Sequence, residues 1–139
     1  MSATRTTAID PSHLEPIVAR FNGRSRDALL PMLHCLQDIY GWLPEVALQA
    51  ASRTLRVPLA DIHGVVEFYT MFYNKPMARR VIRVCEDAAC SRAGCHDVMA
   101  AIETELGLTH GETSEDGRIS YEHVPCLGMC ELAPVALDG

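Results

Sequence analysis

The sequence predicts a mixed α and β protein, with a small helical bundle over residues 1–76 followed by an α/β domain over residues 77–139. Apolar residues recur at helical spacing through the first part, whereas the second part begins with the alternation typical of a strand. A polar break with a proline, at residues 74–76, separates the two patterns. We therefore place the domain boundary there.

Four short helices are expected in the first part. Their approximate ranges are 10–22, 27–41, 44–55 and 58–69. Asp10 is a suitable N-cap for the first helix, and Pro44 and Pro58 open the third and the fourth. Pro31 prevents a regular helix from starting much earlier, so the second helix should begin near Asp27 with an irregular first turn.

The second part has the pattern of a strand, a loop and a helix, followed by further strands. Residues 80–85 alternate and are rich in Val and Ile, which predicts a strand. A helix that carries Cys95 on its apolar face and ends at Gly107 should follow. A second strand is expected over residues 118–124, and a third short apolar segment covers residues 135–137.

Composition and charge argue against several classes of protein. The chain has 139 residues, a formal net charge of -6 and 48% hydrophobic residues, a balance typical of a globular protein. The negative charge and the lack of Lys- or Arg-rich runs argue against nucleic-acid binding. No apolar run approaches the roughly 20 residues of a membrane helix. Because the polar N-terminus lacks a secretory signal, we expect a cytoplasmic protein with reduced thiols.

Four of the six cysteines form two pairs at the ends of expected strands: Cys85 with Cys90, and Cys126 with Cys130. If those strands are neighbours in one sheet, the two loops emerge near the same edge and four thiolates can converge on one metal centre. Gly128 allows the tight turn that the second pair requires. We also expect the next helix to start just after Cys90 and to direct its positive end at that cysteine.

The spacing of the cysteines leaves more than one interpretation open. Four thiolates suit a [2Fe-2S] cluster, but pairs at this spacing also bind structural Zn²⁺, which would make the chain a zinc-stabilised interaction module. A thiol oxidoreductase that uses Cys85 and Cys90 is the weakest interpretation, because such enzymes separate their cysteines by two residues. Cys35 and Cys95 lie on apolar helix faces and are interpreted as packing residues. The six histidines lack metal-binding spacing.

Four segments carry a resemblance to a known family. They are LQDIYGWLP at residues 36–44, IHGVVEFYTMF at 62–72, VIRVC at 81–85 and CLGMCELAP at 126–134. Over nearly its whole length the sequence resembles the 24 kDa-type [2Fe-2S] subunit of NADH dehydrogenase. That family includes the gamma subunit of NAD-dependent formate dehydrogenase and related subunits of NAD-reducing hydrogenases. The resemblance favours iron over zinc.

The resemblance implies a helical N-terminal domain joined to a thioredoxin-like [2Fe-2S] ferredoxin domain. It implies that Cys85, Cys90, Cys126 and Cys130 ligate the cluster. FMN and NAD are expected only on a larger flavin- and NADH-binding partner subunit, with which the cluster exchanges single electrons, so no catalytic chemistry is expected of this chain alone. The short N-terminal leader favours a NAD-dependent formate dehydrogenase as the parent complex, with respiratory NADH:quinone oxidoreductase and NAD-reducing hydrogenase as alternatives.

Two further expectations come from the same resemblance. The helical domain, with residues 64–72, is expected to form the docking surface for the partner and its support. In the family, the thioredoxin-like domain continues with a hairpin strand and a final helix after an Ala-Pro-Val segment, which is residues 133–135 here. A domain that stops at Gly139 is therefore expected to be truncated at its C-terminus, with an exposed sheet edge beside the cluster.

Overall fold

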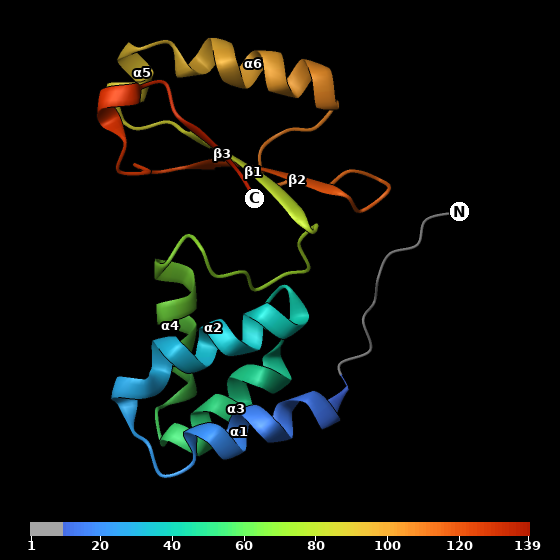
Figure 1. Cartoon of the computed structure of the whole chain (residues 1–139), viewed down its shortest axis with the longest axis vertical. Helices are drawn as coiled ribbons and strands as arrows, with labels where there is room; N and C mark the ends of the chain where they lie inside the picture. Colours follow the sequence, from blue (N-terminus) through green and yellow to red (C-terminus); the bar gives the residue numbers. More distant parts are fainter. Residues whose placement is uncertain (1–9) are drawn as a thin grey trace. The chain divides into compact units, whose positions relative to one another are not determined.

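The structure is a computed structural model and describes residues 10–139 (Figure 1). These residues divide into two compact units: residues 10–76, called the helical unit below, and residues 77–139, called the α/β unit. Within residues 10–139, no helix has both the length and the apolar character needed to cross a bilayer.

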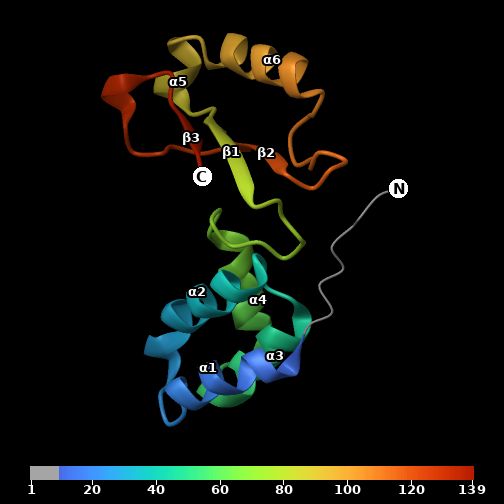
Figure 2. The ribbon, with the colours of Figure 1, turned by 45° about the vertical axis from the view of Figure 1, so that its right-hand side comes forward.

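Four α-helices make up the helical unit, and Figure 2 shows their arrangement; buried residues of all four form one core cluster. They are α1 (Leu14–Phe21), α2 (Leu29–Tyr40), α3 (Glu45–Leu55) and α4 (Leu59–Phe68). A 3-10 turn at Arg26–Ala28 precedes α2, which confirms the irregular start expected there. Pro31 lies in the first turn of α2, where its missing N–H leaves no helical hydrogen bond unmade.

The centre of the helical core is formed by α2. Met32, Leu33 and Leu36 are fully buried and recur at helical spacing, so one face of α2 is shielded from water. Leu48 of α3 and Ile62 of α4 are buried against the same cluster. Burial of these apolar side chains is the main source of stability for helices this short.

The α/β unit contains a three-stranded sheet in the order β2-β1-β3. Its elements are β1 (Arg80–Cys85), α5 (Ala88–Arg92), α6 (Cys95–Leu106), β2 (Ile119–Val124), a 3-10 turn at Cys130–Leu132, and β3 (Ala136–Asp138). Strands β1 and β2 are parallel, whereas β3 runs antiparallel to β1. Figure 1 shows α5 and α6 on one side of the sheet.

The strands agree with the predicted ones to within one residue. Strand β1 has the expected bounds, while β2 and β3 each begin one residue later than predicted. The N–H of Arg118 donates to the Asp116 carboxylate at 3.0 Å, so this residue belongs to the preceding turn rather than to β2. All three residues of β3 are exposed, and this strand forms one edge of the sheet.

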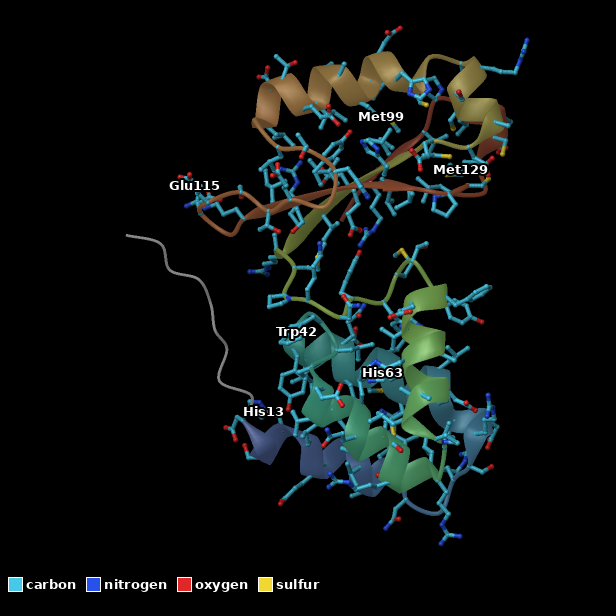
Figure 3. The ribbon with its side chains drawn as sticks, turned by 180° about the vertical axis from the view of Figure 1, so that it is seen from behind. His13, Trp42, His63, Met99, Glu115 and Met129 are labelled. Carbon is cyan, nitrogen blue, oxygen red and sulfur yellow. The ribbon has the colours of Figure 1, made fainter. Side chains whose placement is uncertain are left out.

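The core of the α/β unit lies between α6 and the sheet. Cys95 and Met99 of α6 pack with Val84 of β1 and Tyr121 of β2, and all four side chains are buried. In Figure 3 the side chain of Met99 points from α6 toward the strands. Gly107, with φ of 64°, ends α6 in the left-handed conformation, as expected from the sequence.

Candidate functional site

The parallel pairing of β1 and β2 brings the loops that carry the cysteine pairs to one edge of the sheet. Cys85, the last residue of β1, lies opposite Val124, the last residue of β2. The N–H of Glu86 donates to the carbonyl of Val124 at 3.0 Å, so the two chains stay side by side beyond the strands. The expectation that these strands are neighbours is therefore confirmed.

The first pair, Cys85 and Cys90, is buried. Asp87 caps α5 by accepting a hydrogen bond from the N–H of Ala88 at 2.7 Å, and Cys90 is the third residue of this short helix. The prediction that a helix starts just after Cys90 was therefore wrong. The cap at Asp87 starts a helix earlier, and Gly94, with φ of 92°, separates it from α6.

The second pair, Cys126 and Cys130, lies in an exposed loop after β2. Their sulfur atoms are 3.4 Å apart. Gly128 has φ of 78°, and its N–H donates to the Cys126 sulfur at 3.3 Å. The turn at Gly128 expected from the sequence thus brings both sulfurs to one side of the loop, and Figure 3 shows Met129 at the outer end of this loop.

Backbone hydrogen bonds join the two pairs. The N–H of Leu127, in the second loop, donates to the sulfur of Cys85. The N–H of Val135 donates to the sulfur of Cys90, and the Val135 carbonyl accepts from the Cys85 N–H at 3.0 Å. The charges of Cys85 and Cys90 also help to raise the pKa of Cys130. The two pairs therefore lie near each other, at the ends of β1 and β2.

Within each pair, one thiol donates a hydrogen bond to the other. Burial raises the pKa of Cys85, but the N–H of Asp87, the Cys90 thiol and the N–H of Leu127 outweigh it and lower the pKa overall. Burial and donation to Cys85 raise the pKa of Cys90, while donation to Cys126 and the charge on that sulfur raise the pKa of Cys130. Four negative charges can coexist here only with a positive counterion such as a metal centre.

The donor set fits a [2Fe-2S] cluster. Each iron of such a cluster takes two thiolates, and the four sulfurs lie as two close pairs. Backbone N–H groups aimed at Cys85, Cys90 and Cys126 can stabilise negative charge on the sulfurs. Among residues 10–139, no group of three or more His, Cys, Asp or Glu side chains is arranged around a single metal ion.

Residues 14–137 match the model of the thioredoxin-like [2Fe-2S] ferredoxin family. This chain belongs to that family. Its cofactor is accordingly a [2Fe-2S] cluster, and the ferredoxin fold that the sequence predicted is confirmed.

Several relatives of this ferredoxin-family chain are E-type subunits of NADH-quinone oxidoreductases. The protein from Pseudomonas aeruginosa is 36% identical over 112 residues, which cover 81% of this chain and 68% of the relative. The one from Aquifex aeolicus is 38% identical, and the match covers 81% of this chain and 70% of the relative. A third, from Rhizobium meliloti, is 34% identical, and the match covers 91% of this chain and 74% of the relative.

Two solved structures with a similar fold are of NAD+-reducing [NiFe]-hydrogenase. The air-oxidized form has a TM-score of 0.64 at 24% sequence identity and the H2-reduced form has 0.66, also at 24%. This chain covers 19% of either hydrogenase chain. At this identity the likeness concerns the fold alone.

The two remaining cysteines lie in cores. Cys95 is fully buried beside Met99, and Cys35 is half-buried against the helical core, so both pack as expected. His63 lies 3.2 Å from a carboxylate oxygen of Glu45, which accounts for that side chain without a metal.

Sequence reasoning missed the cap at Asp87 and, among the N–H groups that point at the sulfurs, those of Leu127 and Val135. The cap at Asp87 could have been predicted from the sequence, because an Asp directly before two alanines is typical of a helix start. No sequence pattern could have predicted the roles of the two N–H groups, because any residue other than proline supplies the same donor.

Proposed function

We propose that this chain is an electron-transfer subunit whose [2Fe-2S] cluster is held by Cys85, Cys90, Cys126 and Cys130. It exchanges single electrons with the FMN of an NAD(H)-binding partner subunit. The observation that carries the ligand assignment is the parallel pairing of β1 with β2, which brings the loops of the two cysteine pairs to the same end of the sheet. Four thiolates brought together in this way form the ligand set of a [2Fe-2S] cluster.

The chain's own groups have distinct tasks at this site. Burial of Cys85 and Cys90 keeps water from the inner pair, and N–H groups stabilise negative charge on the sulfurs. When bound, the cluster supplies a site that accepts and returns one electron. Cys126 and Cys130 face solvent beside Met129 and Leu132, whose side chains are 46% and 61% exposed. An exposed sulfur pair with an apolar rim is the side from which a partner can approach closely.

A second apolar surface supports docking through the helical unit. Phe68 is 78% exposed at the end of α4, and Tyr69 and Met71 are each 44% exposed. Gln37 holds this segment in place: its side-chain amide donates to the Met71 carbonyl at 2.7 Å and accepts from the Tyr73 N–H at 2.9 Å. We propose that residues 64–72 contact the partner, as the resemblance implies.

The parent complex is the finer part of the proposal. A NAD-dependent formate dehydrogenase is the complex that the sequence favoured. The names of the relatives support an NADH-quinone oxidoreductase as the alternative, and an NAD-reducing hydrogenase is the other complex that the resemblance allows. We further propose a cytoplasmic location, in which the six cysteines, all free in the structure, stay reduced.

The ligand assignment is tested by metal analysis and EPR of the dithionite-reduced protein after anaerobic purification. Iron and sulfide in equal amounts with a rhombic signal are expected for the wild type. Cys126→Ser and Cys130→Ser should lose or strongly alter this signal, whereas the matched control Cys95→Ala should keep it. An unchanged spectrum in Cys126→Ser would refute the assignment. Stoichiometric zinc without iron in a folded protein would favour the interaction module.

The parent complex is tested on material purified through a tag on this chain from its native host. NAD+ reduction by formate in the purified complex is expected. Reduction by hydrogen instead, or oxidation of NADH by a quinone alone, would assign the chain to the hydrogenase or to the respiratory enzyme. The absence of any flavin subunit from the preparation would contradict the proposed partner.

A further inference from the structure

We propose that a hollow in the helical unit, lined by Arg24, Arg26, Arg53 and Arg56, binds a small molecule that carries two or more phosphate groups. The hollow lies where the loop after α1 meets the end of α3 and the start of α4, and its volume is about 580 Å³. This volume falls within the range of roughly 300–1,000 Å³ typical of small-molecule sites. The hollow shares no residue with the cysteine loops, and the proposal does not rest on the proposed function.

Positive charge is concentrated at this hollow. Residues 10–76 contain six Lys and Arg residues, and four of them line it. All four arginines are exposed. Two of the arginines form ion pairs, Arg24 with Asp27 and Arg26 with Asp61. The four positive charges of the arginines therefore outnumber the two negative charges paired with them. In a chain with a net charge of -6, such a local excess of positive charge favours an anionic ligand.

Most of the guanidinium donors are not used by the hydrogen bonds found within the unit. Arg24 donates from one nitrogen to Asp27 at 3.1 Å, and Arg26 donates from one nitrogen to Asp61 at 2.6 Å. Arg53 donates to a Gln49 oxygen at 3.3 Å. Because each guanidinium has five N–H groups in a planar fork, these arginines retain donors for phosphate oxygens.

Arg56 is the most informative residue of the set. It ends α3 with φ of 55°, and it is the one non-glycine residue in the left-handed region among residues 10–139. Glycine adopts this conformation at lower energy and is the usual residue at such a helix end. Within the described residues, the Arg56 side chain has no hydrogen bond or ion pair. A ligand outside the chain accounts for an arginine where glycine would be more stable.

Phosphate is the ligand chemistry that fits these groups. Guanidinium forks bind phosphate oxygens in pairs, and arginines on two loops can reach two phosphate groups at once. A single carboxylate would meet only one of the forks. Leu55 and Val57 also line the hollow and are buried, so part of its wall is formed by the packed core of the unit.

The test is calorimetric titration of the full, cluster-loaded chain with inorganic pyrophosphate and with ATP at low ionic strength. Saturable binding of at least one probe is expected, weakening as salt increases. Arg56→Gly should lower the affinity about tenfold, because one charge-assisted contact is lost. It should also keep or raise the unfolding temperature, because glycine prefers the local backbone conformation. Loss of binding in this variant therefore does not reflect unfolding.

Arg53→Ala should weaken binding similarly. Arg118→Ala is the matched control, since it removes one exposed arginine that belongs to the α/β unit, and it should leave the affinity unchanged. The proposal is overturned if neither probe binds, or if Arg118→Ala weakens binding as much as Arg56→Gly. Tighter binding of an acidic peptide, lost in Arg56→Gly, would also overturn it and would assign the hollow to a protein partner.

Discussion

Replacing Asp87 with proline tests whether a single backbone N–H tunes the cysteine site. The N–H of Asp87 donates to the sulfur of Cys85. Asp87 has φ of -70°, which proline adopts without strain, so the substitution deletes the donor with little change of backbone. It also removes the carboxylate, which caps Ala88 and places a negative charge near Cys85.

Three variants separate these effects. Asp87→Asn keeps a capping oxygen and removes the charge, so it should raise the reduction potential. Asp87→Ala also removes the cap, at a cost of about 1 kcal/mol in the free energy of unfolding. Asp87→Pro additionally removes the N–H. If that donor favours the more negative reduced state by about 1 kcal/mol, the potential of Asp87→Pro should lie about 40 mV below that of Asp87→Ala.

The assay is an EPR-monitored redox titration of all three variants and the wild type. Iron content and far-UV circular dichroism, measured on the same samples, establish that each variant is folded and loaded. Equal potentials in Asp87→Ala and Asp87→Pro, or a higher potential in the proline variant, would refute the argument that this N–H stabilises negative charge on the sulfurs.

Two further predictions concern stability. Burial, with the charge of Glu103, raises the pKa of Tyr121 to about 12 from 10.0, so the folded state keeps a proton that the unfolded state loses. The contribution of Tyr121 to the free energy of unfolding should be complete below about pH 10 and fall by about 2 kcal/mol as the pH rises toward 12. In urea unfolding curves, Tyr121→Phe should abolish this fall. The surface variant Tyr69→Phe should keep it. Met32→Ala should cost about 2–5 kcal/mol, because it leaves a cavity in the helical core. Met71→Ala, at a side chain 44% exposed, should change stability by less than about 0.5 kcal/mol in the same assay, and equal losses in the two variants would contradict the core assignment.

Much of the local structure was predictable because it depends on neighbouring residues. The strand predicted from the alternation over residues 80–85 has the same bounds as β1. The position of Pro31 predicted the irregular turn before α2. The spacing of the cysteines narrowed the site to two loops. The first helix of the α/β unit begins before Cys90 and not after it, because the capping side chain of Asp87 sets its start.

The sequence by itself determined the chemistry available to the site: four thiols in two pairs, at the ends of two strands, with Gly128 to turn the second loop. Only the tertiary structure decided how the pairs meet. The parallel pairing of β1 with β2 and the hydrogen bond from Leu127 to Cys85 join residues about forty positions apart. Such contacts leave no local pattern, because every non-proline backbone carries the same N–H donor and only the folded chain selects which sulfur it meets.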